Sequence, residues 1–403
     1  MNWVHKVVEQ HKEVESPRNF WYWSALAAVS AVVKDNVWLN RGGHYKLFPN
    51  IYVMLHADSG LKKGPPVAFA KNIVKRVNNT RIISGRSSIQ GILKELGTAQ
   101  TIPGGRVNAK SVAFIVASEF SSSLVSDPAA MTILTDLYDR HWNEGEYKSL
   151  LKMESFQLKD PCITLLVATN QAHFEDFVAD KDVHGGFVGR TFVIAESEVQ
   201  TLNPLIKKLD NPPDINELAE YPKKLMNITG QFNELEGTAA GELYEDWYYK
   251  FYRTIYEQKI KDETGTIARF GDSVLKIAML LSLSEGTDLV ITEEHIDEAI
   301  KVGERLIGNI RRTTMTKKRT DDQALVKASI IKELLSRESH AITRTLLLSK
   351  QIMGINAKEL DEIMLSFSEA GIIETKSINN QIIFEMTEDK VEEYRRHFEG
   401  KSK

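Results

Sequence analysis

Four short apolar runs, each bounded by turn residues, constrain the fold more than any other feature of the sequence. They are hydrophobic on consecutive rather than alternate positions, which is typical of strands buried on both faces of a parallel sheet. The runs cover residues 51–55, 112–117, 163–168 and 191–195. Stretches with helical spacing separate them, at residues 66–77, 88–96 and 129–138. Strands that alternate with helices predict an α/β fold with a parallel, doubly wound sheet over residues 48–200.

The composition is that of an ordinary globular protein. Of 403 residues, 42% are hydrophobic and 26% charged, which excludes a disordered chain, and the length predicts roughly two to four domains. The formal net charge of −4 means that any nucleic-acid surface is local. A single cysteine, Cys162, excludes an intramolecular disulfide and a cysteine metal site. With no leader pattern and no membrane-spanning apolar run, we expect a cytoplasmic protein without a membrane partner.

Helical patterns flank the expected sheet on both sides. Apolar residues at helical spacing predict an amphipathic helix over residues 17–34, within an N-terminal helical segment, residues 1–47, that covers the sheet. After the sheet, the strand pattern ends. Helical patterns follow at residues 241–261, 273–283 and 293–307. Residues 201–312 are therefore expected to form an all-helical subdomain, a lid.

A change in charge separates the C-terminal part of the chain. Residues 301–320 carry seven basic side chains and one acidic one, whereas residues 321–403 carry twelve basic and fifteen acidic ones. This break predicts a linker or an exposed helix end near residues 313–321. Beyond it come patterns for helices at 324–337, 343–353 and 357–370, and for a hairpin at 372–385 that turns at Asn379-Asn380. This is the layout of a winged helix over residues 321–398, whose partner is duplex DNA or, given its net acidity, a protein.

The segment after the first apolar run has the composition of a phosphate-binding loop. Between a buried strand and a helix, such a loop presents backbone N–H groups and the positive helix end to an anion, and a lysine reaches the outer phosphates. The candidate nucleotide-binding residues are Asp58, Ser59, Gly60, Leu61, Lys62, Lys63 and Gly64. The pattern G-x-x-x-x-G-K-[ST] is incomplete, because Ala57 and Lys62 replace glycines and Gly64 replaces a hydroxyl residue. An ordinary strand-to-helix turn with two solvated lysines is the alternative.

Polar residues also border the other three apolar runs. Glu119 follows the second run, Asn170 follows the third, and Arg190 precedes the fourth. Open α/β sheets bind ligands at the ends of their strands. We therefore expect the Glu119 strand to lie beside the loop strand, so that Glu119 acts on magnesium and on the attacking water. Asn170 is then placed to sense the terminal phosphate, and Arg190 to reach the nucleotide of a neighbouring subunit. Each of the three also has a purely structural alternative.

Further motifs between residues 17 and 283 extend this pattern. The full set is Pro17-Arg18-Asn19-Phe20, Pro49-Asn50-Ile51-Tyr52-Val53, Ser59-Gly60-Leu61-Lys62-Lys63-Gly64, Ile115 to Phe120, Leu134-Thr135-Asp136-Leu137-Tyr138-Asp139, Ala168-Thr169-Asn170, Gly185-Gly186-Phe187-Val188-Gly189-Arg190, and Arg269 with Val274-Leu275-Lys276-Ile277-Ala278. Together they resemble the helicase-like P-loop ATPases that phages and mobile elements encode for their own replication, often fused to or beside a primase.

The resemblance implies a fold and a set of roles. It implies a RecA/AAA+-like P-loop core that binds ATP and Mg²⁺, with Lys63 as the phosphate lysine and Glu119 as the catalytic acid and magnesium contact. Asn170 would be the sensor, Arg190 the finger and Arg269 the lid arginine. The assembly would be a ring, usually a hexamer, that moves along single-stranded DNA, with a primase or other replication proteins as partners, in the host cytoplasm if the gene is a phage's.

Two departures from the family pattern bear on catalysis. Pro65 and Pro66 stand where a Ser or Thr is expected just past the lysine, and Ser118 stands where the family has the other member of an acidic pair. The missing hydroxyl and carboxylate favour slow or absent hydrolysis.

Two basic groups are candidates for DNA contacts. Two alternating runs about a polar turn over residues 147–158 predict a hairpin, and ring helicases direct a lysine from such a hairpin, here Lys148 or Lys152, at the strand backbone. The second group is the basic run Arg311, Arg312, Lys317, Lys318 and Arg319. A solvent-facing hairpin and a solvated charged face are the alternatives.

Three functions agree with these patterns. The first is an ATP-driven DNA helicase or helicase-like motor, and the second a DNA-binding replication initiator or helicase loader that keeps the ATPase fold with weak or no hydrolysis. The third is an adaptor that recruits a protein through the acidic winged helix. The S-x-x-K match at Ser59–Lys62 lacks the companion motifs of acyl-enzyme hydrolases, and the histidines lack the spacing of a metal site.

Overall fold

The computed structural model describes most of the chain. The described residues are 2–85, 87–97, 100–102, 105–107, 110–119, 128–139, 146–150, 155–170, 174, 186–199, 201–204, 213–257, 262, 264–337, 339–349, 357–378 and 381–399. Contacts divide the chain into two compact units, Met1–Thr314 and Met315–Lys403. The division falls inside one continuous helix, α12 (Glu293–Leu335). The division lies within the range 313–321 where a linker or an exposed helix end was predicted, but the helix does not end there, because α12 continues through the basic run.

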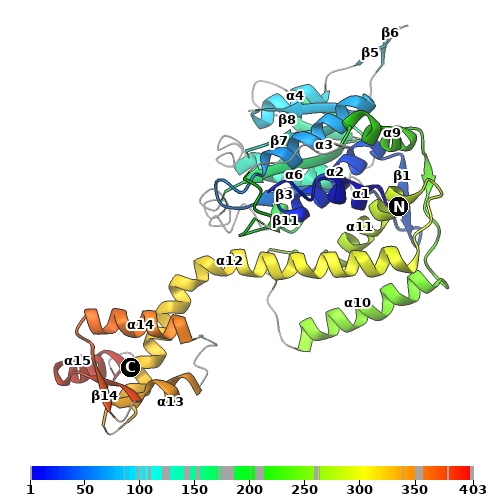
Figure 1. Ribbon diagram of the computed structural model, residues 1–403. Coiled ribbons are helices and arrows are strands. Elements are labelled where there is room, and N and C mark those ends of the chain that lie inside the picture. Colours follow the sequence, from blue (N-terminus) through cyan, green and yellow to red (C-terminus); the bar gives the residue numbers. More distant parts are fainter. Residues whose placement is uncertain are drawn as a thin grey trace. The chain divides into compact units, whose positions relative to one another are not determined.

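A five-stranded parallel sheet forms the centre of the first unit, as predicted. Its order is β11-β3-β10-β7-β4. The strands are β3 (Tyr52–His56), β4 (Arg81–Ser84), β7 (Val112–Ala117), β10 (Cys162–Thr169) and β11 (Thr191–Ala195). Sequence patterns did not predict β4, because this edge strand contains only two apolar residues between Arg81 and Ser84. The sheet runs through the blue, cyan and green part of the ribbon (Figure 1).

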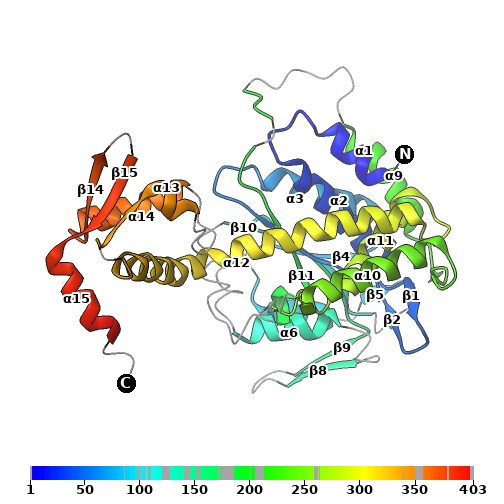
Figure 2. The same ribbon diagram turned by 90° about the horizontal axis from the view of Figure 1, so that it is seen from below.

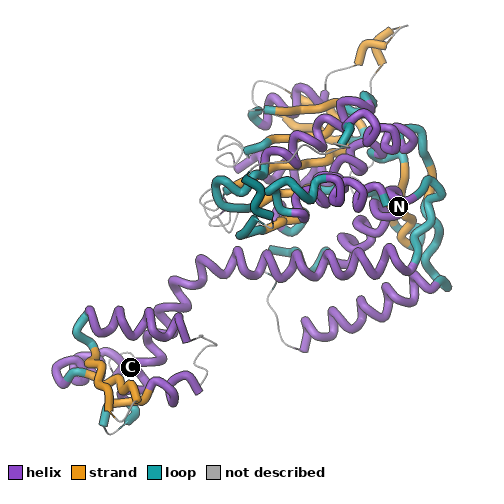
Figure 3. Tube along the Cα trace, in the orientation of Figure 1, coloured by secondary structure: helices purple, strands orange, loops and turns teal. Residues whose placement is uncertain are grey.

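Helices cover both faces of this sheet, which explains why its strands are apolar on consecutive positions. Alternate residues of β3 enter different cores: Val53 and Leu55 pack with α2 (Arg18–Val33) and α3 (Gly64–Val77). Tyr52 and Met54 pack on the opposite face with α4 (Ile89–Gly97) and α6 (Pro128–Tyr138). Figure 3 shows the orange strands of the sheet between purple helices. Burial of both faces is the physical cause of the pattern from which the sheet was predicted.

The N-terminal segment is part of the core and not an outer cover. Every residue of α2 from Phe20 to Val33 is buried, because the helix contacts three strands of the sheet and also the helices α1 (Trp3–Gln10), α3, α9 (Ile215–Leu225) and α11 (Phe270–Glu285). The predicted amphipathic character is therefore wrong. The segment is also not wholly helical, since β1 (Val37–Arg41) and β2 (Tyr45–Leu47) pair with each other and β1 pairs with β12 (Gly230–Gln231).

The helices after the sheet share its core. The three helical patterns correspond to α10 (Ala239–Glu257), α11 and the beginning of α12, whereas α9 was not predicted. Residues Val274 and Ile277 of α11 belong to the same buried cluster as the sheet residues Val53 and Leu55. Helices α10 and α12 run side by side in both views (Figures 1 and 2), and Trp247 Nε1 donates to Glu304 Oε1 between them at 3.0 Å.

Two antiparallel hairpins belong to the α/β part of the first unit. One consists of β5 (Gln100–Ile102) and β6 (Gly105–Val107), and the other of β8 (Glu146–Leu150) and β9 (Ser155–Lys159). The second hairpin was predicted. No helix in the described part of the chain is long and apolar enough to cross a membrane.

The second unit combines helices with a small antiparallel sheet. After the end of α12 come β13 (Ala341–Thr343), α13 (Arg344–Ser349), α14 (Ala357–Glu369), β14 (Ile373–Ile378), β15 (Gln381–Met386) and α15 (Glu388–Glu399). The sheet order is β13-β15-β14, and its core includes Phe367 and Phe384. The predicted helices and hairpin strands are present, with β13 and α15 in addition. The predicted turns at 354–356 and 379–380 lie outside the described residues.

Candidate functional site

The loop between β3 and α3 has a backbone suited to binding an anion. It follows His56 at the carboxyl end of β3 and ends where α3 begins at Gly64. Gly60 has φ +100° and Lys62 φ +48°, while Lys63 has the right-handed helical values φ −65° and ψ −30°. A left-handed residue followed by a right-handed one turns successive N–H groups toward one point, which makes a concave anion site.

Contacts from two distant segments fix this loop. Ser16 Oγ donates to the carbonyl oxygen of Lys62 at 2.7 Å, and the Ala57 N–H donates to the Thr169 carbonyl at 3.4 Å. The first contact holds a non-glycine residue in the left-handed region, which costs about 1–2 kcal/mol. Sequence reasoning missed Ser16, because nothing in the local pattern links it to a loop 46 residues away.

Lys63 lies over the loop from which it comes. Its Nζ donates to the carbonyl oxygens of Ala57 at 2.7 Å and Asp58 at 2.9 Å. Burial lowers the pKa of Lys63, and the negative charges of Asp58 and Glu119 oppose that shift. Glu119 therefore lies near enough to act on the lysine, although the two residues are 56 positions apart in the sequence.

The first turn of α3 offers few hydrogen-bond donors. Gly64, Pro65 and Pro66 are the first three residues of the helix, and proline has no N–H group. The geometry of the turn is nevertheless regular, since proline is compatible with the first turn of a helix. The helix end keeps its positive potential but presents the N–H of Gly64 without those of the next two residues.

Strand order decides which groups lie next to the loop. The expectation that the Glu119 strand lies beside the loop strand is wrong, because β10 is inserted between β3 and β7. Asn170, directly after β10, is half-buried, and Glu119, two residues after β7, is exposed. Lys63, Asn170 and Glu119 thus follow three neighbouring strands at the same edge of the sheet.

The last strand adds two polar residues to this edge. Glu196 follows β11, and its N–H donates to the His56 carbonyl at 3.0 Å. Asn19 Nδ2 donates to Glu196 Oε1 at 2.5 Å. The rule that singled out Glu119, a polar residue just after a buried strand, would also have found Glu196. Asn19 belongs to a motif of the sequence, but its position beside β11 depends on the tertiary fold.

Arg190 and Arg269 lie at the opposite edge of the sheet. Arg190 precedes β11, level with Ile51 in the pairing register, roughly 16 Å along the strands from His56. Arg190 Nε donates to Asp139 Oδ2 at 2.7 Å, and its Nη1 to the Gly186 carbonyl at 2.9 Å. Burial lowers the pKa of Arg269, and the charge of Arg190 lowers it further, so the two guanidinium groups are neighbours. Neither reaches the phosphate-type loop of its own chain.

A buried lysine completes this second group of charges. Lys276 Nζ donates to the main-chain and side-chain oxygens of Asn50, both at 2.8 Å, and lies 4.0 Å from the ring centre of Tyr138. The side chain is only 4% exposed. Burial lowers the pKa of Lys276 to about 8, with the charge of Asp139 acting in the opposite direction. This lysine ties α11 to the start of β3.

Candidate DNA-contacting residues lie on strand β8 and on helix α12. Lys148 belongs to β8 and pairs in register with Gln157 of β9, whereas Lys152 lies outside the described residues. Residues 311–319, with Arg311, Arg312, Lys317, Lys318 and Arg319, lie within α12.

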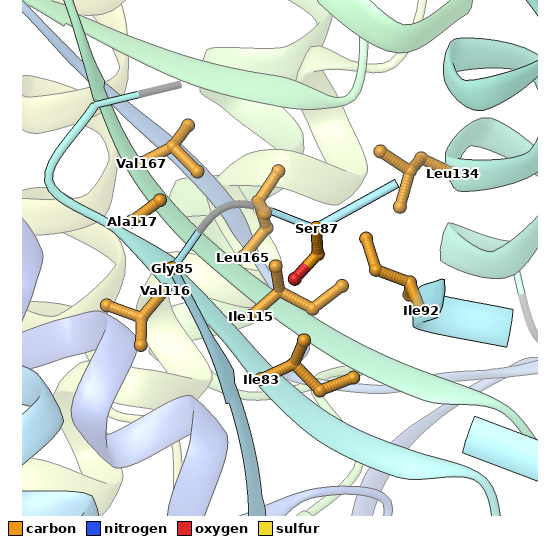
Figure 4. Close-up of a pocket in the computed structure, with 10 residues that line it drawn as sticks. All are labelled: Ile83, Gly85, Ser87, Ile92, Ile115, Val116, Ala117, Leu134, Leu165 and Val167. Carbon is orange, nitrogen blue, oxygen red and sulfur yellow. The ribbon is translucent and has the colours of Figure 1, made fainter. Parts of the chain in front are cut away.

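A small cavity lies between β7 and the helices on one face of the sheet (Figure 4). Its volume is about 10 Å³, and Ser87 is the one residue with a polar side chain among those that line it: Ile83, Gly85, Ser87, Ile92, Ile115, Val116, Ala117, Leu134, Leu165 and Val167. This is room for about one water molecule and not for a nucleotide.

The described residues contain no group of three or more His, Cys, Asp or Glu side chains that could hold a metal ion. Neither a scan against protein-family models nor a search of curated proteins finds a match to this chain.

Proposed function

We propose that this chain binds a nucleoside triphosphate, ATP, at residues 58–64 and acts on DNA, as helicase-like P-loop ATPases do. One observation carries the proposal: an anion-type loop, an amide and a carboxylate follow the three neighbouring strands β3, β10 and β7 at one edge of a parallel sheet. Ligands bind at this edge in open α/β folds. Across the sheet, the lysine of the loop after β3 comes first, the amide of Asn170 after β10 second and the carboxylate of Glu119 after β7 third.

The present position of Lys63 agrees with this role. Its ammonium group is bound by two neutral carbonyl oxygens, of Ala57 and Asp58. Phosphate oxygens are charged acceptors and form stronger hydrogen bonds with an ammonium group than carbonyls do. A triphosphate would therefore replace the carbonyls as partners of Lys63 without rearrangement of the sheet.

One carboxylate is compatible with magnesium in this setting. Mg²⁺ is usually bound through one or two carboxylates together with substrate phosphates and water. Glu119 would supply a protein carboxylate, directly or through water, and the nucleotide would supply phosphate oxygens. Gly64 offers no hydroxyl, so the ion would have one protein ligand fewer than in the complete loop pattern.

The same features favour a second function, an initiator or loader that binds ATP with little hydrolysis. Pro65 and Pro66 remove two N–H groups from the start of α3, and hydrogen bonds from N–H groups to a charged phosphate contribute about 1.5–3 kcal/mol each. Fewer donors mean less stabilisation of the charge that develops during phosphoryl transfer. Binding without turnover is the behaviour expected from this loop if Glu119 does not compensate.

An arginine finger would have to serve a second subunit. Arg190 lies at the edge of the sheet opposite the loop of its own chain and is paired with Asp139. A role for Arg190 and Arg269 in hydrolysis therefore requires an oligomer, such as the hexameric ring that the sequence resemblance implies, and requires the pair with Asp139 to open.

The second unit supports a protein partner better than duplex DNA. Helices followed by an antiparallel hairpin, with β13 beside β15, agree with a winged helix. Helix α14, which directly precedes the hairpin, contains four acidic residues and one basic residue. Phosphates would be repelled from such a helix. We assign DNA contact to the hairpin β8–β9 and to the basic run of α12, and a protein partner to the part of the second unit that follows α12.

The test is ATP binding and turnover by the full-length protein with and without single-stranded DNA. The matched variants are Lys63→Ala and Lys62→Ala, which remove adjacent lysines of the same loop. We expect Lys63→Ala to weaken ATP binding at least tenfold, which corresponds to about 1.4 kcal/mol, and Lys62→Ala to weaken it far less. Native mass with and without ATP and DNA reports ring formation.

The outcomes separate the two functions. DNA-stimulated turnover that Lys63→Ala abolishes supports the motor, and tight binding without turnover supports the loader. Equal ATP binding by wild type and Lys63→Ala would contradict both.

A further inference from the structure

A second cavity lies at the other end of the first unit, away from the phosphate-type loop. Its volume is about 610 Å³, which is in the range of ligand-binding pockets. Residues of the β1–β2 hairpin, of the segment 234–236 and of the first turns of α10 line it; Figure 2 shows where the ribbons of the hairpin and of α10 lie. The lining residues that matter here are Arg41, Tyr45, Glu234, Glu236, Tyr244, Glu245, Tyr248 and Tyr249.

Aromatic rings form one wall of this cavity. The ring centres of Tyr244 and Tyr248 are 5.9 Å apart, and those of Tyr248 and Tyr249 are 6.2 Å apart. Tyr244 is buried, whereas Tyr249 is 67% exposed at the rim. A large aromatic surface that leads from solvent into a cavity is typical of a binding site, because tyrosine is enriched where proteins bind partners.

Three glutamate carboxylates belong to the lining of the same cavity. Glu234, Glu236 and Glu245 line the cavity and are all exposed. Within the described part of the chain, no side-chain hydrogen bond or ion pair neutralises them. Gly241 brings the segment with Glu234 against the start of α10, since a Cβ atom there would lie 2.0 Å from the Leu235 carbonyl oxygen.

Arg41, a cation of the lining, already has its partners. Arg41 Nε lies 3.7 Å from Asp272 Oδ1, and its guanidinium carbon lies 5.9 Å from the ring centre of Tyr244. Tyr45 Oη also donates to Asp272 Oδ2 at 3.0 Å. With Arg41 balanced by Asp272, the three glutamates leave the cavity with a negative potential next to the π faces of tyrosines.

We propose that this cavity binds an arginine or lysine side chain of a partner protein. Carboxylates together with tyrosine rings attract a guanidinium or ammonium group through charge and cation–π interactions. The same carboxylates repel phosphates, which excludes a nucleic-acid strand despite the aromatic surface. A protein segment is favoured over a small polyamine because Tyr249 extends the aromatic surface outside the cavity, where a longer chain would lie on it. The inference does not depend on nucleotide binding.

The experiment measures the binding of a labelled peptide to the full-length protein by fluorescence anisotropy. The peptide comprises residues 309–321, the most basic run of this chain, and a control peptide has glutamine at its five basic positions. The protein variants are Glu245→Gln and Tyr249→Ala, both at exposed positions, and the matched control is Glu257→Gln at the far end of the same helix. Spermidine and oligothymidylate are tested as competitors.

The proposal expects saturable, salt-sensitive binding of the basic peptide only. Glu245→Gln and Tyr249→Ala should each weaken it roughly three- to tenfold, and Glu257→Gln should leave it unchanged. Four results would overturn the proposal: no binding of the basic peptide up to millimolar concentration, equal binding of the control peptide, equal loss in Glu257→Gln, or binding of spermidine or oligothymidylate to the cavity in place of the peptide.

Discussion

The two edges of the central sheet carry similar residue types in opposite environments. At the carboxyl edge, Asp58, Lys62 and Glu119 are exposed, and the ammonium group of Lys63 donates to two neutral carbonyls. At the amino edge, the side chains of Arg190 and Asp139 are 12% and 17% exposed and form an ion pair. The first edge keeps charge available for a ligand, whereas the second uses charge within the protein. Residue type alone therefore does not identify a site.

The difference arises from what covers each edge. Helix α11 and the segment before it pack over the amino edge, so closely that a Cβ on Gly189 would lie 2.5 Å from the Thr264 carbonyl oxygen. At the carboxyl edge, the contact from the N-terminal segment to the loop is made by Ser16, to a backbone carbonyl. A covered edge desolvates its charges, and desolvated charges must be paired.

If Arg190 were dispensable for folding, the charges at the amino edge would not serve the stability of the protein, and the contrast between the two edges would not hold. Arg190→Ala would leave the half-buried carboxylate of Asp139 without its partner, and we expect it to lower the free energy of unfolding by about 3–5 kcal/mol. Urea denaturation measures this, with the exposed Arg253→Ala as a control that should change it by less than about 0.5 kcal/mol. Unchanged stability together with lost ATP turnover would instead assign Arg190 to a neighbouring subunit's nucleotide.

The buried Lys276 makes the free energy of unfolding depend on pH. The pKa of Lys276 is about 8 in the folded protein, below the ordinary lysine value of 10.5, so the unfolded state binds more protons between these values. Stability should therefore rise with pH, by about 2 kcal/mol between pH 7 and 9.5. Denaturation of wild type and Lys276→Met over this range isolates the contribution. Parallel pH profiles for the two proteins would show that the buried ammonium group is not the cause.

One of the two N–H groups that proline removes from the first turn of α3 can be restored by substitution. Pro65→Ala restores an N–H in the first turn, and we expect about fivefold tighter ATP binding, or about 1 kcal/mol. Stability should fall by about 0.5 kcal/mol, because alanine increases the freedom of the unfolded chain. Calorimetric titration tests the affinity. Weaker binding after Pro65→Ala would mean that the phosphates do not lie against this helix end.

A further prediction concerns the support of the loop. Ser16→Ala removes the hydrogen bond to the Lys62 carbonyl and should cost about 1 kcal/mol of stability. It should also weaken ATP binding severalfold, since Lys62 is then free to leave its left-handed conformation. Ser30→Ala, which loses a hydrogen bond to Thr164 Oγ1 far from the loop, serves as the control: it should lower stability without weakening ATP binding.

The sequence predicted the helices and strands better than it predicted how they pack against one another. Four of the five strands of the central sheet, all except the edge strand β4, were identified because burial on both faces makes them uniformly apolar. Helix α2 is equally apolar, but the helical spacing of its apolar residues predicted a helix with one buried face. Its polar positions Ser24 and Ser30 are buried as well, which no periodicity indicates. The short strands β1, β2 and β12 were missed, and the pairing of β1 with β12 joins residues nearly two hundred positions apart.

By itself the sequence determined the alternation of strands and helices, the loop with Lys63 and the position of Glu119 and Asn170 after strands. These follow from local patterning and from the rule that parallel strands point the same way. Only the tertiary structure decided that β10 separates the loop strand from the acidic strand, that Arg190 is paired with Asp139 at the opposite edge, and that tyrosines and glutamates from distant segments share one cavity. Strand order, desolvation and pairing are set by contacts between remote residues, whose free energies no local pattern contains.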